Sequence, residues 1–591
     1  MSFLPTHPNE FPHSAFQPDF IVVTPDAYVD HPSFGAAVIG RFVESQGFSV
    51  AVLSQPVTKE DFKSLGEPKY AFLLSCGVVD SMVANYSVSG SRRKEDAYSD
   101  EGKAGKRPDR VCEVYSKALK KAFHNSTIIA GGIEPSLRRL SHYDYWSDTV
   151  RHSILYTAPV DLVVYGMGEV PLLEILHFAK LGVNLKKVKG VAGTAYLTNL
   201  SLASSAIKNA IANGGDKKYS VVSSFSRVSG DKKIYAKAFM ETTAASGDKK
   251  GIIQKQSDTD FAVINPPAKP ADTALLDKIY ALPFMRMAHP KYKNIPAIEE
   301  VRFSVTAHRG CFGDCSFCAL KAHQGKNISV RSKESILAEI EKITQMPDFK
   351  GYIHDIGGPS ANFHSNSCAK TQNRGEYCND KNCVGHKLCG ALKVDNSDYL
   401  EILRQARSIK GVKKVFIRSG VRFDVALLDK EFLTELVTHH VSGQLKVAPE
   451  HVADSVLNLM NKPPHKTYLD FYKAFMDATK KAGKEQYLVP YFVSSHPGCT
   501  IKDAVKLTEY LMSIKYQPLQ VQDFYPTPGS LSTTMYYCEF DPRSGKKLFV
   551  AKSKEDKVMQ RALMQYREPR NKELVSKALK LAGREDLLGK I

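Results

Sequence analysis

Short apolar runs alternate with amphipathic helical patterns along the N-terminal part of the chain. The first helical pattern occupies 35–46. Five apolar runs have the length of buried strands, and most of them are rich in Val or Ile: 20–23, 49–53, 70–75, 127–130 and 161–165. Such runs, separated by helices, are typical of a parallel, doubly wound sheet that binds ligands at the carboxyl ends of its strands. The pattern predicts an N-terminal Rossmann-like α/β domain over 1–195.

The same alternation returns in the second half of the chain. Six apolar runs fit strands: 302–307, 351–357, 413–420, 443–450, 486–496 and 517–524. Six amphipathic segments alternate with them: 333–345, 396–409, 429–439, 453–461, 466–482 and 501–515. Their apolar residues recur at helical spacing. Six β/α units predict a partial (β/α)6 barrel over 296–530, followed by a small helical C-terminal region over 531–591.

The segment between these two regions has a different composition. Residues 196–262 are rich in Ser, Ala, Asn and Gly and carry lysine pairs at 217–218 and 249–250. These features are typical of loops and turns. We therefore expect 196–295 to form an irregular connector, with a few strands and helices, and an arm that leads into the barrel.

Composition and charge narrow the class of protein only slightly. Of 591 residues, 43% are hydrophobic and 24% are charged, as in ordinary globular proteins. No apolar run approaches the ~20 residues of a membrane span, and the N-terminus does not resemble a signal peptide, so we expect a cytoplasmic protein that is not bound to a membrane. The net charge of +19 favours contact with nucleic acid or with an acidic protein, but the lysines are spread over many segments, which favours a solvated surface.

A cluster of cysteines provides the first candidate metal ligands in the sequence. Seven of the eleven cysteines lie within 311–389, and three of them, Cys311, Cys315 and Cys318, follow the first barrel strand with the spacing C-x3-C-x2-C. Iron–sulfur clusters normally take four cysteine ligands, so three ligands leave one iron of a cubane open to a small molecule. Zinc is the weaker interpretation, because structural zinc sites prefer paired knuckles with four ligands. With the aromatic Phe317 before the last cysteine, the spacing resembles the signature of radical S-adenosylmethionine (SAM) enzymes.

The resemblance implies a 4Fe-4S cluster on the three cysteines and SAM on the open iron, where SAM is split to a 5′-deoxyadenosyl radical. It also implies that Phe317 packs by the adenine and that the backbone of Gly357 and Gly358 holds the methionine ammonium. Pro359 stands where the superfamily has a glutamate, so these carbonyls must do more, or another acid substitutes. Candidate ligands of the SAM carboxylate and ribose are Arg418, Ser419 and Glu450. Ordinary barrel-lining side chains are the alternative for these three.

A second cysteine group lies in a polar insertion after the second barrel strand. Its members are Cys368, Cys378, Cys383 and Cys389. Four cysteines on a short loop with few apolar residues suggest a metal that holds the loop together, either zinc or an auxiliary iron–sulfur cluster. Unligated thiols are the alternative, and His364 and His386 are substitute ligands.

The N-terminal region resembles the cobalamin-binding domain that often precedes a radical SAM core. The resemblance rests on the strand order and on the glycines at 131–132 and 166–168. The base-off fingerprint Asp-x-His-x-x-Gly is missing, because Asp30 is adjacent to His31 and the glycine, Gly35, comes one position late. Cobalamin binding is therefore left open. A degenerate Rossmann-like domain that positions substrate is the alternative.

Several segments together resemble the YgiQ-type family of radical SAM iron–sulfur proteins: 26–35, 131–146, 165–169, 303–318 and 355–359. The family implies a 4Fe-4S cluster and SAM, and it does not indicate a substrate. We expect a radical SAM enzyme that receives electrons from a donor such as flavodoxin or ferredoxin. The alternatives are a cobalamin-dependent radical SAM methyltransferase and a non-catalytic iron–sulfur or zinc protein that binds RNA.

Overall fold

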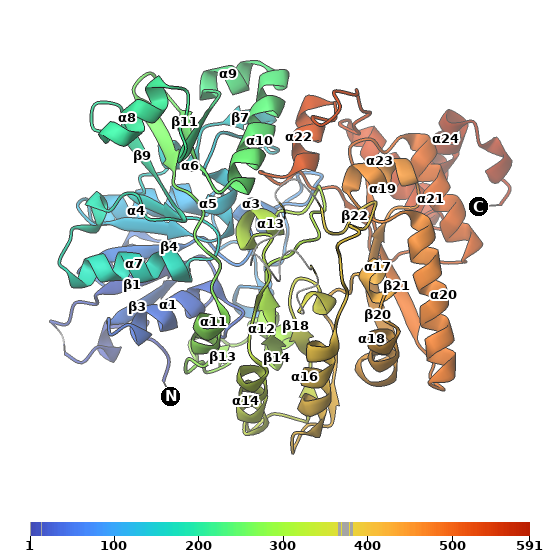
Figure 1. Ribbon diagram of the computed structural model, residues 1–591, viewed down its shortest axis with the longest axis horizontal. Helices are drawn as coiled ribbons and strands as arrows, with labels where there is room; N and C mark the ends of the chain where they lie inside the picture. The colour runs from blue at the N-terminus through green and yellow to red at the C-terminus, as the bar shows by residue number, and fades with distance from the viewer. Residues whose placement is uncertain (1, 14, 365–367, 369–377, 379–381, 591) are drawn as a thin grey trace. The chain divides into compact units, whose positions relative to one another are not determined.

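The computed structural model describes residues 2–13, 15–364, 368, 378 and 382–590 (Figure 1). The chain divides into two compact units. Unit 1 comprises Met1–Thr306, Ala322–Gly325 and Ser329–Glu339, and unit 2 comprises Ala307–Lys321, Lys326–Ile328 and Ile340–Ile591. The three-cysteine loop therefore lies near the start of unit 2.

Unit 1 is built on one nine-stranded sheet with the order β10-β11-β12-β9-β8-β5-β4-β1-β3. Its strands are β1 (Phe20–Thr24), β3 (Val50–Ser54), β4 (Ala71–Ser75), β5 (Ile128–Gly131), β8 (Leu162–Val164), β9 (Thr194–Asn199), β10 (Tyr219–Val222), β11 (Gly251–Lys255) and β12 (Asp260–Ile264). The pairings from β3 to β8 are all parallel, whereas β9 and β12 join in antiparallel fashion. The five predicted strands thus form the parallel part of the sheet.

Helices cover both faces of this parallel part (Figure 1). Neighbouring residues of a strand point to opposite faces, and accordingly Phe20 and Ile21 belong to different buried apolar clusters. The cluster of Phe20 includes α1 (Gly35–Ser45) and α7 (Glu169–Lys180), and that of Ile21 includes α4 (Val111–Ala122). Both faces are buried, which explains the continuous apolar runs in the sequence.

The expected connector carries more regular structure than its composition suggests. Strands β9 to β12 extend the sheet of unit 1, and β11 and β12 form an antiparallel hairpin. The lysine pairs stand in the turns just before β10 and β11, while Ile252 and Val263 on the strands are buried. Polar turns around short strands therefore gave this segment the composition of a loop.

The remaining elements of unit 1 are short strands and helices around the sheet. They are β2 (Val29–Asp30), α2 (Lys59–Lys63), α3 (Ser81–Asn85), α5 (Ile133–Arg138), β6 (His142–Asp144), β7 (Thr149–Arg151), α6 (Ile154–Thr157), α8 (Ser205–Ala212), α9 (Phe225–Gly230), α10 (Lys232–Gly247), α11 (Thr273–Tyr280), β13 (Met287–Ala288), α12 (Pro296–Val301) and β16 (Ser329–Val330).

Strands occur at all six positions predicted for the barrel, and most of them are shorter than predicted. They are β14 (Ser304–Thr306), β17 (Tyr352–Ile353) with β18 (Asp355–Gly357), β19 (Lys414–Val415), β20 (Gln444–Glu450), β21 (Tyr487–Ser494) and β22 (Gln522–Asp523). Within unit 2, β17 pairs with β19 in parallel, and β20, β21 and β22 form a parallel sheet. The alternating helices are α14 (Lys333–Thr344), α16 (Ser397–Ser408), α18 (Lys430–Glu435), α19 (Asp454–Met460), α20 (His465–Lys481) and α21 (Ile501–Ser513).

The C-terminal part of unit 2 is helical, as predicted. It contains α22 (Leu531–Cys538), α23 (Lys554–Met564) and α24 (Lys572–Ala582), and the last two pack on α21 and on each other. Among the described residues, no helix combines the length and the apolar character needed to cross a membrane.

Candidate active site

The three-cysteine loop runs from β15 (His308–Arg309) to α13 (Leu320–Gln324). Cys311 and Cys315 are half-buried, and Cys318 is exposed. The loop has no regular secondary structure between these two elements. Its shape therefore depends on contacts with the rest of unit 2.

Two glycines allow the loop to approach its surroundings closely. Gly310 has a φ of +91°, and a Cβ at this position would lie 1.9 Å from the carbonyl oxygen of Asn327, so only glycine fits. The N–H of Gly313 points to the Sγ atom of Cys311 at 3.4 Å. The backbone thus supplies a hydrogen-bond donor to the first thiol.

Two buried cations stand beside the thiols, and the sequence analysis missed both. Arg422 is 7% exposed; its Nη1 atom donates to the Sγ atom of Cys315 at 3.7 Å, and its other nitrogens donate to Asp424 at 2.9 and 2.7 Å. Lys462 is 4% exposed. Burial raises the pKa of the Cys311 thiol, and the charges of Arg422 and Lys462 oppose that rise. The two cations therefore offset part of the cost of burying an anionic sulfur at this loop.

Hydrogen bonds tie the loop to distant segments of unit 2. The N–H of Ser316 donates to the carbonyl of Met460 at 3.0 Å, and its hydroxyl lies 2.7 Å from that of Ser532 on α22. The side-chain amide of Asn461 donates to the carbonyl of Asp314 at 2.9 Å. The barrel and the C-terminal helices therefore both hold the loop in place.

Phe317, the aromatic residue of the motif, is half-buried beside His496. The two rings lie 6.2 Å apart in an edge-to-face arrangement. The Nε2 atom of His496 is in turn 2.7 Å from the hydroxyl of Ser532. Phe317 is thus held at one side of the loop, and its contact with an adenine stays a prediction.

The glycines expected to hold the SAM ammonium are tightly enclosed. A Cβ on Gly357 would lie 1.8 Å from the hydroxyl of Ser419, and one on Gly358 would lie 2.6 Å from the Nε2 atom of His308. The carbonyl of Gly357 accepts the N–H of Ala307 at 2.7 Å. The structure therefore places both glycines next to the segment that leads into the three-cysteine loop.

Ser419 and Arg418 are organised by one carboxylate. Asp355 accepts the N–H groups of Arg418 and Ser419 at 2.8 and 3.1 Å, and the hydroxyl of Ser419 at 2.6 Å. The side chain of Ser419 lies beside Gly357, whereas Arg418 is exposed. Asp355 belongs to the segment 355–359 that resembles the family, but its contacts with residues 418–419 could not be predicted from the sequence.

Glu450 is buried at the end of β20 and has the unusual φ of +69°. Its carboxylate is 3.5 Å from the ammonium of Lys462. Burial raises the pKa of Glu450, and Lys462 opposes that rise. Glu450 is thus linked to the three-cysteine loop through Lys462, and its contact with SAM stays a prediction.

The second cysteine group surrounds a cavity of about 230 Å³. The lining residues are Cys368, Cys378, Asn382, Cys383, Cys389, Gly390 and Ala391. Residues 365–367, 369–377 and 379–381 of this insertion lie outside the described residues. All four predicted cysteines therefore line one space, and their role as metal ligands stays a prediction.

The crevice where a cobalamin-type ligand would bind is filled by the chain itself. Strand β3 lies on one side of β1 and β4 lies on the other, so the strand order changes direction at β1. Ligands of doubly wound sheets bind at the carboxyl ends of the strands at such a point. There Arg107, which is 1% exposed, lies 2.7 Å from Asp26 and 3.0 Å from Asp96. Its guanidinium would be 2.8 Å from a Cβ on Gly77, which follows β4. These residues do not fit cobalamin in this crevice.

His31, the histidine of the degenerate fingerprint, is engaged in the same unit. It is fully buried, its Nδ1 atom accepts the N–H of Ser33 at 3.0 Å, and its Nε2 atom is 3.3 Å from the carbonyl of Arg302. Both ring nitrogens therefore contact backbone groups, which does not suit a cobalt ligand.

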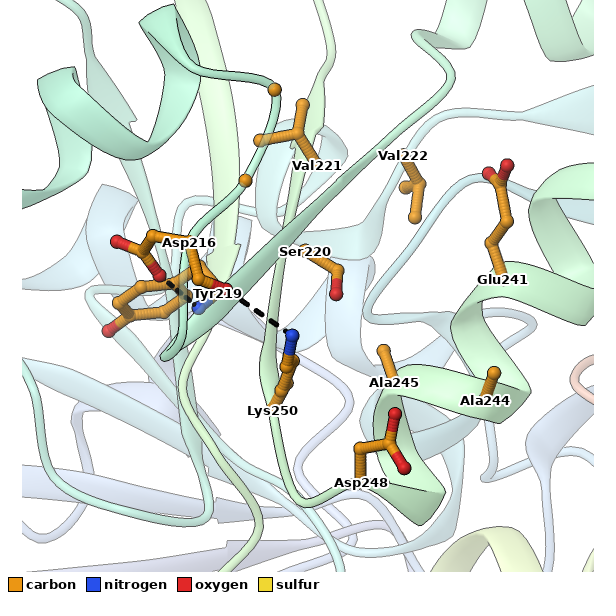
Figure 2. A pocket seen from close by; sticks show the side chains of 12 residues that line it. Asp216, Tyr219, Ser220, Val221, Val222, Glu241, Ala244, Ala245, Asp248 and Lys250 are labelled. Carbon is orange, nitrogen blue, oxygen red and sulfur yellow. Dashed lines mark hydrogen bonds between the residues drawn. The ribbon is translucent and has the colours of Figure 1, made fainter. Parts of the chain in front are cut away.

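Unit 1 also contains an open cavity of about 410 Å³ between β10 and α10 (Figure 2). Figure 2 shows Asp216, Glu241 and Asp248 around it, with Lys250 donating to the backbone carbonyl of Asp216 at 3.4 Å. All of its lining residues lie within 214–250. None of the predicted site residues lines this cavity.

Comparisons with known proteins agree with the chemistry of the three-cysteine loop. Residues 3–304 match the family described as "Radical SAM N-terminal", residues 305–511 match the "Radical SAM superfamily", and residues 519–590 match a domain of unknown function. The protein is therefore a radical SAM enzyme, a class that combines a 4Fe-4S cluster with SAM.

Full-length relatives define the family within this class. A UPF0313 protein of Clostridium botulinum (strain Okra / Type B1) is 50% identical over 584 residues, which are 97% of this chain and 88% of the relative. A UPF0313 protein of Clostridium perfringens (strain SM101 / Type A) is 47% identical, over 97% of this chain and 86% of the relative. The chain belongs to the UPF0313 family, which confirms the YgiQ-type resemblance.

A solved structure supports the fold alone. The radical SAM methyltransferase TsrM from Kitasatospora setae, solved with tryptophan and a SAM analogue, matches with a TM-score of 0.50 at 10% identity. The match covers 93% of this chain and 90% of TsrM. The predicted α/β architecture is thereby confirmed.

Proposed function

We propose that Cys311, Cys315 and Cys318 hold the 4Fe-4S cluster of this radical SAM enzyme. The observation that carries the proposal is the setting of the loop: three thiols stand on one short segment, with the buried cations Arg422 and Lys462 beside them. Cationic neighbours favour thiolates, which are the form that ligates iron. When bound, the cluster supplies the electron that cleaves SAM to methionine and a 5′-deoxyadenosyl radical.

The methionine end of SAM lies at Gly357 and Gly358 in this proposal. The carbonyl of Gly357 already accepts the N–H of Ala307, so the carbonyl of Gly358 is the better partner for the ammonium. Pro359 stands where the superfamily has a glutamate, and Asp355 takes the role of that acid in this proposal. The Oδ2 atom of Asp355 is close enough to Gly357 for this role, since it would be only 2.8 Å from a Cβ there. A carboxylate at this position provides the negative charge that an ammonium group requires.

The other predicted residues complete the pocket. Arg418, Ser419 and Glu450 bind the carboxylate and the ribose of SAM in this proposal, and Phe317 packs by the adenine. The position of Ser419 beside Gly357 supports this assignment. The radical then abstracts a hydrogen atom from a substrate.

The electron comes from an acidic low-potential donor such as flavodoxin or ferredoxin. The net charge of +19 supports this proposal, because opposite charges speed the encounter of two proteins.

The test is anaerobic reconstitution followed by SAM cleavage with a strong low-potential reductant. We expect about four irons at this loop and slow release of 5′-deoxyadenosine and methionine even without substrate. Alanine at Cys311, Cys315 or Cys318 should abolish release, whereas Cys112→Ala, a buried cysteine of unit 1, should preserve it. S-adenosylhomocysteine as the only product of SAM would contradict the proposal and favour polar methyl transfer.

A further inference from the structure

The second cysteine group is folded around its cavity by the chain on both sides. Cys368 forms a β-bridge with Leu392, and the N–H of Cys389 donates to the carbonyl of Cys383 at 3.0 Å. The N–H of Leu392 in turn donates to the carbonyl of Cys389 at 3.0 Å. These bonds bring the first and last cysteines of the group to the same space, although 21 positions separate them in the sequence.

The size of the space distinguishes a cluster from a single ion. The cavity of about 230 Å³ is many times the ~10–15 Å³ that a site for one water molecule needs by the same measure. A structural zinc ion needs no such volume, because four sulfur atoms surround it at about 2.3 Å. The lining leaves room for a group of several atoms.

We propose that Cys368, Cys378, Cys383 and Cys389 bind a second 4Fe-4S cluster, not a single zinc ion. This site goes beyond the proposed function, which needs only the cluster at the three-cysteine loop. Four cysteines give every iron a protein ligand, so this cluster has no open iron and does not bind SAM.

The second site shares a hydrophobic core with the three-cysteine loop. Phe312 of the loop packs with Cys368, Cys383 and Val384 in one buried cluster, and its ring stacks on Phe363 at 3.9 Å.

A polar connection accompanies this core. Asp314 of the loop lies 3.7 Å from Lys326, whose charge acts on the Cys383 thiol. Gly385 would place a Cβ 2.2 Å from Asn461, the residue that binds the carbonyl of Asp314. The two cysteine groups are therefore neighbours within unit 2.

The test separates the two sites with matched variants. The triple variant Cys311→Ala, Cys315→Ala and Cys318→Ala should retain about four irons and four sulfides per chain, with less than stoichiometric zinc. Its reduced spectrum should be that of a 4Fe-4S cluster and should not respond to SAM. The quadruple variant with alanine at the four cavity cysteines should keep the SAM-responsive cluster. Cys538→Ala, a buried cysteine outside both groups, should keep the iron content of the wild type.

Wild-type protein provides a second measurement that does not depend on the folding of variants. Anaerobically prepared protein should contain about eight irons per chain, and Mössbauer spectra should show two cluster environments, one altered by SAM. About four irons that are lost in the triple variant would overturn the proposal, whether or not one zinc accompanies them. If the three-cysteine assignment alone were wrong, the wild type and the triple variant would contain the same iron, about four per chain, and the wild type would not respond to SAM.

Discussion

Replacing Gly358 by alanine tests where the methionine end of SAM binds. A Cβ there would lie 2.6 Å from the Nε2 atom of His308 and 2.7 Å from the carbonyl oxygen of the same residue. The ring can rotate, but the carbonyl belongs to β15, which leads into the three-cysteine loop. Either β15 or Gly358 must therefore move by about 0.7 Å to reach ordinary contact, and such overpacking costs about 1–3 kcal/mol.

SAM binds only when the glycine carbonyls and the three-cysteine loop are in their native places. Binding must therefore reverse the movement that relieved the contact, and the free energy of that contact is lost from SAM binding. We expect the Kd for SAM to rise roughly 5- to 150-fold, measured by anaerobic equilibrium dialysis on reconstituted protein. Iron content should change little. Gly420→Ala is the matched control, because no atom lies within 4 Å of its Cβ position. An unchanged Kd in Gly358→Ala, with normal iron content, would refute the placement of SAM at these glycines.

Three further predictions concern other parts of the structure. Arg422→Gln removes the cation that donates to Cys315. Since a charged hydrogen bond contributes about 1.5–3 kcal/mol, the reduction potential of the cluster should become roughly 60–130 mV more negative. An EPR-monitored redox titration that finds no shift would count against this role of Arg422. Gly310→Ala should lower the iron retained after reconstitution, measured by iron analysis, because its Cβ would overlap the carbonyl of Asn327. Wild-type protein incubated with hydroxocobalamin should elute from gel filtration without corrinoid absorbance, because Arg107 fills the crevice; retention of the corrinoid would show that the crevice opens.

The positions of the strands in the sheet of unit 1 could be predicted because both faces of that sheet are covered. The first four residues of β1, 20–23, are all apolar, and helix α21 begins and ends within two residues of the predicted segment. Strand lengths were less predictable, since β19 contains only Lys414 and Val415. The hairpin of β11 and β12 was hidden because its polar turns dominated the composition of the segment.

The candidate site was predictable where its residues are neighbours in the sequence. The three cysteines and the two glycines belong to short motifs, and the residue types and spacing of each motif indicate what it binds. Arg422 and Lys462 could not be found in this way, because each comes from a different segment and acts only through a contact made by folding. Arg107 was missed for the same reason, as its partners Asp26 and Asp96 meet it only in the folded unit.

The filled crevice of unit 1 has a consequence for how the protein responds to its surroundings. A domain that binds a free ligand gains stability by mass action, as the logarithm of the ligand concentration relative to its Kd. In unit 1 the group that occupies this place is Arg107, which is part of the chain and is always present at the same effective concentration. The folding of this unit should therefore be independent of cofactor supply, so that starvation for a corrinoid would leave its thermal stability and its cellular abundance unchanged.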